Sequence, residues 1–244
     1  MISTTNPLEG KHVIVMGGSA GIGFATAKAA AEKGAVITIV ASNQQRIDFA
    51  LKQLPGNAKG QVADLSKEEN IKNFFAVQSS FDHLVYTAGE NLQLNHIDET
   101  SLSEAQKFFT IRYWGALAAV KYGAPKINQG GSITLTSGIA GNRPGKGWGI
   151  AASITSAMEG FARAMAVELA PTRVNIVSPG IVKTDLWGAI PENEREKMYQ
   201  QYAEVLLVRK VATPEDIALA YIYLMEQSFG TGNTIVADGG GVLV

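Results

Sequence analysis

The chain has 244 residues, no cysteine and a formal net charge of −1. The lack of cysteine excludes disulfides and thiolate sites, and we expect no metal; the lack of a basic run leaves no long-range attraction to nucleic acid or anionic membranes. Charged residues are only 18%, below the roughly 25% usual in soluble domains, which predicts self-association. We expect one cytoplasmic domain over residues 1–244, because no signal peptide or membrane-spanning run is visible.

The first predicted unit is a strand, a glycine turn and a helix. The β-branched run 12–16 is typical of a buried parallel strand, and the Ala-rich segment 24–33 is typical of a helix packed on a sheet. Between them Gly17, Gly21 and Gly23 lack a Cβ, so the turn can bring backbone amides close to a diphosphate at the helix N-terminus. This pattern predicts a dinucleotide ligand; the alternative is a glycine-rich turn without a ligand.

Further along the chain, predicted strands and helices alternate, as in a parallel sheet covered on both faces. The predicted strands cover 35–41, 59–63, 81–87, 131–137, 173–178 and 234–237. The predicted helices cover 43–54, 67–78 with Ser66 as N-cap, 102–128, 148–170 and 213–225. We therefore predict an α/β fold of Rossmann type, a doubly wound parallel sheet of about seven strands in three α-β-α layers. The polar segment 186–204 is expected to form a lid.

The two longest predicted helices, 102–128 and 148–170, are apolar nearly all round. A helix with a single buried stripe would instead show a polar outer face. We predict that one side of each helix packs on the sheet and the other on a second copy of the chain, which gives a homodimer or homotetramer. The alternative is that neighbouring loops cover the outer side.

The motifs resemble those of the classical short-chain dehydrogenase/reductase (SDR) family over essentially the whole chain. The turn Gly17–Gly23 is similar to its diphosphate turn, Asp64-Leu65 to its adenine-contacting pair, Ala88-Gly89 to the end of its N-N-A-G motif, and Pro179-Gly180 with Thr184 to the segment flanking the nicotinamide. The resemblance implies an NAD(P)(H)-dependent oxidoreductase acting on a small-molecule carbonyl or alcohol. The expected cofactor-binding residues are Gly17, Ser19, Gly21, Ile22, Gly23, Ser42, Asn43, Arg46, Asp64, Leu65, Ala88, Gly89, Pro179, Gly180 and Thr184.

The end of the second predicted strand bears on the choice of cofactor, because NAD-preferring enzymes place an acid there for the ribose 2′-OH. Here Ala41-Ser42-Asn43 supplies no acid, and Arg46 follows one turn later. Short polar groups with a nearby cation suit a 2′-phosphate, so we predict NADP(H) in preference to NAD(H). The alternative is that Arg46 is an ordinary solvated helix residue.

The four catalytic positions that the resemblance implies are all altered. The family uses a Tyr that exchanges a proton with the substrate oxygen, a Lys four residues later that lowers the Tyr pKa, a Ser that holds the oxygen and an Asn in the preceding long helix. In the register set by 157–171, the Tyr, Lys, Ser and Asn positions fall on Ala151, Thr155, Gly138 and Arg112. Ser137, one residue early, is the one recovery we consider.

The candidate catalytic residues are therefore Arg112, Ser137 and Thr155. Arg112 would direct a permanent cation toward the substrate end of the nicotinamide, where it could bind a carboxylate or stabilise an oxyanion. The alternative is that Arg112 pairs with an acid such as Glu90 and fills the vacated site. Thr155 either bonds the nicotinamide ribose or satisfies a backbone carbonyl. The other residues expected in the substrate pocket are Arg143, Trp148 and Trp187.

Two functions from different classes remain open from the sequence. In the first, the chain is an oxidoreductase with non-standard proton transfer, acting on an anionic carbonyl or alcohol substrate bound by Arg112. In the second, it binds the dinucleotide without turnover, as a sensor or an assembly subunit. Non-redox lyase or isomerase chemistry in the same cleft is a third. We favour the first because Arg112 and the expected aromatic residues resemble a built substrate pocket.

Overall fold

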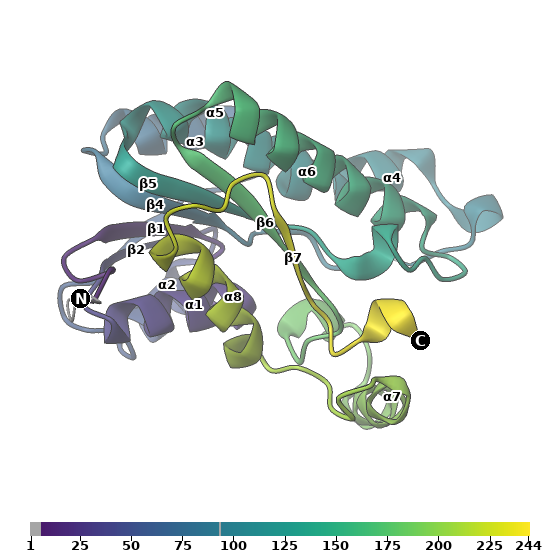
Figure 1. Cartoon of the computed structure of the whole chain (residues 1–244). Helices are drawn as coiled ribbons and strands as arrows, with labels where there is room; N and C mark the ends of the chain where they lie inside the picture. Colours follow the sequence, from purple (N-terminus) through teal and green to yellow (C-terminus); the bar gives the residue numbers. More distant parts are fainter. Residues whose placement is uncertain (1–5, 93) are drawn as a thin grey trace.

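The computed structural model describes residues 6–92 and 94–244. The strands in these residues are β1 (His12–Met16), β2 (Val36–Ala41), β3 (Lys59–Val62), β4 (Phe81–Tyr86), β5 (Ile127–Thr136), β6 (Arg173–Pro179) and β7 (Thr234–Ala237). They form one parallel sheet in the order β3-β2-β1-β4-β5-β6-β7 (Figure 1). The strand order reverses between β1 and β4, which is where a doubly wound sheet opens a crevice for a ligand.

Helices cover both faces of this sheet, so the predicted three-layer α/β fold is confirmed. They are α1 (Gly21–Glu32), α2 (Gln44–Leu51), α3 (Glu68–Ala76), α4 (Leu102–Phe108), α5 (Ala116–Gly123), α6 (Gly149–Glu168), α7 (Glu192–Val205) and α8 (Pro214–Glu226). In Figure 1, α1, α2 and α8 lie on one face and α3, α4, α5 and α6 on the other. The helix α7 lies apart from both layers, near the C-terminus.

The strand β1 separates two hydrophobic cores. Ile14 and Met16 belong to the core beneath α3, α5 and α6, whereas Val13 and Val15 belong to the core that includes the alanines of α1. Successive side chains of a strand point to opposite faces of the sheet. Both faces of β1 are therefore buried, which explains why its sequence is an apolar run without charge.

The prediction of one long helix over 102–128 is wrong. After α4 the chain forms a π-helical turn over Thr110–Gly115, in which the Trp114 N–H donates to the Phe109 carbonyl at 3.0 Å. The Glu90 carboxylate accepts the Ile111 N–H at 2.5 Å and so takes it out of the helical pattern. The helix α5 then ends before Pro125, which has no N–H to continue it.

Two smaller expectations concern helix starts. Ser66 is not the N-cap of α3: Lys67 holds that position, and Ser66 instead bonds the Asp64 carboxylate through its N–H at 3.0 Å and its hydroxyl at 2.6 Å. The predicted start of α8 is confirmed, because Thr213 and Asp216 form a reciprocal capping box. The polar segment 186–204 contains most of α7 and the end of a short 3-10 turn.

Candidate active site

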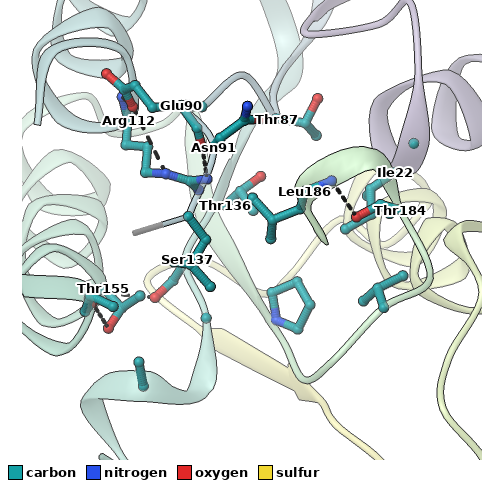
Figure 2. A pocket seen from close by; sticks show the side chains of 18 of the residues that line it. Ile22, Thr87, Glu90, Asn91, Arg112, Thr136, Ser137, Thr155, Thr184 and Leu186 are labelled. Carbon is teal, nitrogen blue, oxygen red and sulfur yellow. Dashed lines mark hydrogen bonds and ion pairs between the residues drawn. The ribbon is translucent and has the colours of Figure 1, made fainter. Parts of the chain in front are cut away.

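A cavity of about 320 Å³ lies at the carboxyl ends of β1, β4, β5 and β6. It collects residues far apart in the sequence at the point where the strand order reverses. The predicted residues on its wall are Gly21, Ile22, Gly23, Arg46, Ala88, Gly89, Arg112, Ser137, Gly138, Ala151, Thr155, Pro179, Gly180 and Thr184. In Figure 2, Arg112 and Glu90 lie on one side of the pocket, and Ile22 and Thr184 on the other.

Other residues predicted to bind the cofactor are not on this wall; they are Gly17, Ser19, Ser42, Asn43, Asp64 and Leu65. Leu65 is buried in the hydrophobic core. The Asn43 side-chain oxygen caps α2 by accepting the Arg46 N–H at 3.0 Å. The Asp64 carboxylate is bonded to Ser66, and these bonds lower the pKa of Asp64. A direct cofactor contact of these residues therefore stays a prediction.

The glycine turn packs too closely for side chains. Gly17 has φ +90°, and a Cβ on it would lie 2.6 Å from the Ala88 nitrogen. A Cβ on Gly23 would press on the Gly17 carbonyl oxygen and the Thr87 hydroxyl. The following helix α1 has no side-chain cap at Ala20 and no acid in its first turn. Its first N–H groups therefore face the cavity without a side-chain acceptor, as the diphosphate of a dinucleotide requires.

Two charged residues from different segments meet at the edge of the cavity. Arg46 Nη2 lies 3.8 Å from the Asp185 Oδ2, and the two side chains are 60% and 78% exposed. Both line the cavity. An ion pair this exposed is weak, so the Arg46 guanidinium is available to a second anion.

The hydroxyls that could replace the missing tyrosine are bonded to the protein. Thr155 donates to the carbonyl oxygens of Ala151 at 3.0 Å and Ala152 at 3.1 Å, which is the alternative weighed for it from the sequence. Ser137 Oγ lies 3.1 Å from the Thr155 carbonyl oxygen and 3.2 Å from Glu159 Oε1. Ser137 and Thr155 are shown in Figure 2. Glu159 was not predicted as a site residue, although it lies one helical turn after Thr155 on the same face of α6.

Arg112 lies on the cavity wall and also contacts Glu90, so both interpretations from the sequence stay open. It lines the cavity with 23% of its side chain exposed, and its Nη2 donates to the Glu90 backbone carbonyl (Figure 2). Its Nε lies 3.9 Å from Glu90 Oε2, and its Cζ lies 5.2 Å from the centre of the Phe108 ring. Burial lowers the pKa of the Arg112 guanidinium and the Glu90 carboxylate raises it. An arginine pKa is so high that the group stays a cation at neutral pH.

The other expected pocket residues divide between wall and surface. Trp148 and Trp187 line the cavity as expected. Arg143 is exposed and does not line it, so its predicted place in the pocket is wrong. Tyr86 is buried and donates to the Ile111 carbonyl at 2.7 Å, and burial raises its pKa well above the ordinary tyrosine value. It therefore supports the fold rather than exchanging a proton. Apolar residues of the cavity wall, such as Leu186, belong to no motif that would have predicted them as part of the site.

Residues 6–92 and 94–244 contain no cluster of three or more His, Cys, Asp or Glu side chains arranged to hold a metal ion. None of their helices is both long enough and apolar enough to span a bilayer.

Comparisons with known proteins agree with this geometry. The family model described as Enoyl-(Acyl carrier protein) reductase matches residues 17–241. The short-chain dehydrogenase/reductase ucsE of Acremonium sp is 32% identical, over 98% of each chain. The dehydrogenase/reductase SDR family member 4 of Homo sapiens is 29% identical, over 96% of this chain and 88% of the relative.

Solved structures give the same result. A small-chain dehydrogenase in complex with NADPH is 33% identical, with a TM-score of 0.86 over 97% of this chain and 100% of the other. The MalC Reductase/Diels-Alderase from Malbranchea aurantiaca is 30% identical, with a TM-score of 0.91 over 99% of this chain and 100% of the other. The glycine turn, the crevice at the strand-order reversal and these matches together place the chain in the short-chain dehydrogenase/reductase family, whose oxidoreductases bind a nicotinamide dinucleotide.

Proposed function

We propose that this SDR-family oxidoreductase uses NADP(H) and acts on a small carbonyl or alcohol without a Tyr-Lys pair. The observation that carries the proposal is that one cavity joins the glycine turn to Arg112. The turn would supply a site for a diphosphate, and Arg112 a half-buried cation on the same wall. Such a cation stabilises negative charge that develops on an oxygen during reaction.

The residues on the wall fit the cofactor. The amides at Gly21 to Gly23 would hold the diphosphate, Arg46 the 2′-phosphate, and Pro179 to Thr184 the nicotinamide end. When bound, the nicotinamide supplies the hydride. The similar chain in complex with NADPH supports the preference for NADP(H) in this chain, together with the lack of an acid after β2.

Proton transfer in this pocket differs from that of a Tyr-Lys enzyme. Arg112 remains protonated and therefore binds negative charge rather than donating a proton. The proton would come from water, from the substrate or from Ser137, which would first have to release its bonds to α6. Loss of an acid-base pair lowers rates by roughly two to four orders of magnitude. Ordinary ketones should therefore be poor substrates.

The test is a screen of small carbonyl compounds with and without a carboxylate. Turnover is measured as the loss of NADPH absorbance. We expect turnover with an anionic member and its loss in Arg112→Gln, with unchanged NADPH binding. Equal turnover of wild type and Arg112→Gln would contradict the role given to Arg112.

A second candidate, dinucleotide binding without turnover, is favoured by one observation. Both hydroxyls near the vacated catalytic positions, those of Ser137 and Thr155, are bonded to protein acceptors. Saturable NADPH binding with no substrate-dependent oxidation across the screen would support a sensor or an assembly subunit.

We also propose that the chain forms a homodimer or homotetramer through α5 and α6. A groove between these helices is lined mainly by apolar side chains, among them Leu117, Phe161 and Met165. Nearby Val167 is 81% exposed and Trp114 58% exposed. Exposed apolar surface of this extent is typical of an interface, and sedimentation as a monomer at micromolar concentration would contradict the proposal.

A further inference from the structure

Glu90 is the residue on which the position of Arg112 depends. It follows Gly89 in the loop after β4, which ends at Tyr86, and its side chain reaches the π-helical turn that contains Arg112. Its two carboxylate oxygens accept backbone N–H groups of that turn, from Ile111 at 2.5 Å and from Arg112 at 3.3 Å. Its backbone carbonyl accepts the Arg112 Nη2. One residue thus holds both ends of the arginine, its backbone and its guanidinium.

The close approach of Arg112 to the chain at Gly89 fixes the guanidinium further. A Cβ at Gly89 would lie 2.6 Å from the Arg112 Cζ, so the arginine packs directly against the glycine backbone. The Phe108 ring lies on another side, 5.2 Å from the Cζ. These contacts leave the guanidinium little freedom to turn away from the cavity that it lines.

The charge of Arg112 is only partly compensated. The shortest distance between its guanidinium and the Glu90 carboxylate is 3.9 Å, from Nε to Oε2, which is beyond a hydrogen bond. The buried Nε has no hydrogen-bond partner among the residues that the structure describes. The carboxylate is bonded instead to the backbone of the turn. A half-buried cation without a full ion pair favours an incoming anion.

Much of the remaining cavity wall is apolar. Its apolar side chains include Leu92, Leu94, Trp148, Met158 and Trp187. The other charged wall residues, Arg46 and Asp185, lie at the edge where they pair with each other. A ligand that fits these surroundings has an apolar body and one anionic group directed at Arg112.

We propose that Glu90 is a positioning residue that aims Arg112 at the anionic group of an apolar organic anion and limits the strength of that anion site. This inference rests on the proposed function and names its substrate class. Glu90 acts in two opposite ways, because its shape holds Arg112 in place while its negative charge opposes the bound anion. Removing only the charge and removing the whole side chain should therefore have effects of opposite sign.

Glu90→Gln keeps an oxygen for the Ile111 N–H and keeps the backbone carbonyl, but removes the negative charge together with the acceptor of the longer, 3.3 Å bond from the Arg112 N–H. We expect an aromatic carboxylate to bind roughly three- to tenfold more tightly, as for removal of one partly screened like charge. Glu90→Ala leaves the Ile111 N–H without its acceptor and releases the turn. We expect roughly tenfold weaker binding, because the cation is no longer held at the cavity wall.

The experiment is calorimetric titration of 2-naphthoate into the protein saturated with NADPH, with neutral 2-naphthamide as the paired probe. The variants are Glu90→Gln, Glu90→Ala and Arg112→Gln, and the matched control is Arg143→Gln, an exposed arginine outside the cavity. We expect 2-naphthoate to bind more tightly to Glu90→Gln, more weakly to Glu90→Ala and not at all to Arg112→Gln, and its affinity for Arg143→Gln to equal that for wild type. The affinity for neutral 2-naphthamide should be the same in all variants.

Separate NADPH titrations and thermal unfolding of each variant distinguish a failure of the proposed function from a failure of the anion site. If wild type does not bind NADPH, the proposed function fails. If NADPH binds normally but 2-naphthoate does not bind, or binds no better than naphthamide, the anion site is refuted. If Glu90→Gln and Glu90→Ala weaken naphthoate binding alike, Glu90 has only a structural role and the inference is overturned.

Discussion

Replacing Gly23 by alanine tests whether the glycine turn is built around a bound diphosphate. The new Cβ would lie 2.9 Å from the Gly17 carbonyl carbon, inside the 3.4 Å at which ordinary contacts begin, and closer still to the Gly17 oxygen and the Thr87 hydroxyl. Because Gly17 contributes backbone rather than a flexible side chain, the start of α1 must move away from β1.

Overpacking of this kind costs about 1–3 kcal/mol. In a chain of this size that corresponds to a fall in Tm of roughly 3–10 °C. The displaced helix also withdraws N–H donors from the diphosphate. Loss of one hydrogen bond to a charged group costs about 1.5–3 kcal/mol, so we expect NADPH affinity to fall at least about tenfold.

The assay is thermal unfolding with and without NADPH, together with a fluorescence titration of NADPH. The matched control is Gly56→Ala, because a Cβ at Gly56 meets nothing within 4 Å. We expect the control to keep both Tm and affinity. Normal NADPH affinity in Gly23→Ala would refute the argument that the close packing of the turn serves the diphosphate.

Three further predictions concern other parts of the chain. Arg46→Gln should weaken NADPH binding about tenfold and leave NADH binding unchanged, because it removes one charge-assisted contact to a 2′-phosphate; parallel titrations check this. Burial lowers the pKa of His83 to about 4, so the unfolded chain binds a proton that the folded chain does not as pH falls from 7 to 4, and folding loses roughly 3 kcal/mol over that window. In urea unfolding, the difference in free energy of unfolding between wild type and His83→Gln should shrink by a similar amount between pH 7 and pH 4. A difference that does not change with pH would contradict the lowered pKa of His83. Leu117→Glu should convert the oligomer to monomers in sedimentation, because it places a charge in the groove between α5 and α6.

The fold was predictable because its signals are local. The buried run 12–16 and the alanines after the glycine turn reflect packing on both faces of a parallel sheet, and both occur in the structure as predicted. The break in the helix over 102–128 was not predictable in the same way. It depends on the Glu90 carboxylate, which reaches the Ile111 N–H from 21 residues away, and no local pattern records such a contact.

The site was predictable at its backbone positions and less so at its side chains. The sequence register of 157–171 assigned Arg112, Thr155 and Gly138 to catalytic positions, and all three line the cavity in the structure. The direction of each side chain depends on neighbours that the register does not identify. Ser137 is bonded to α6 through Glu159, and Arg143 lies on the surface although it was expected in the substrate pocket.

The central claim is that the cavity is a dinucleotide site that prefers NADP(H). Its most direct test is a side-by-side titration of the wild-type chain with NADPH and NADH, in which binding is measured by the fluorescence of Trp148 and Trp187 on the cavity wall. We expect saturable binding with clearly higher affinity for NADPH. Tighter binding of NADH would contradict the role of Arg46, and binding of neither would contradict the assignment of the cavity as a working dinucleotide site.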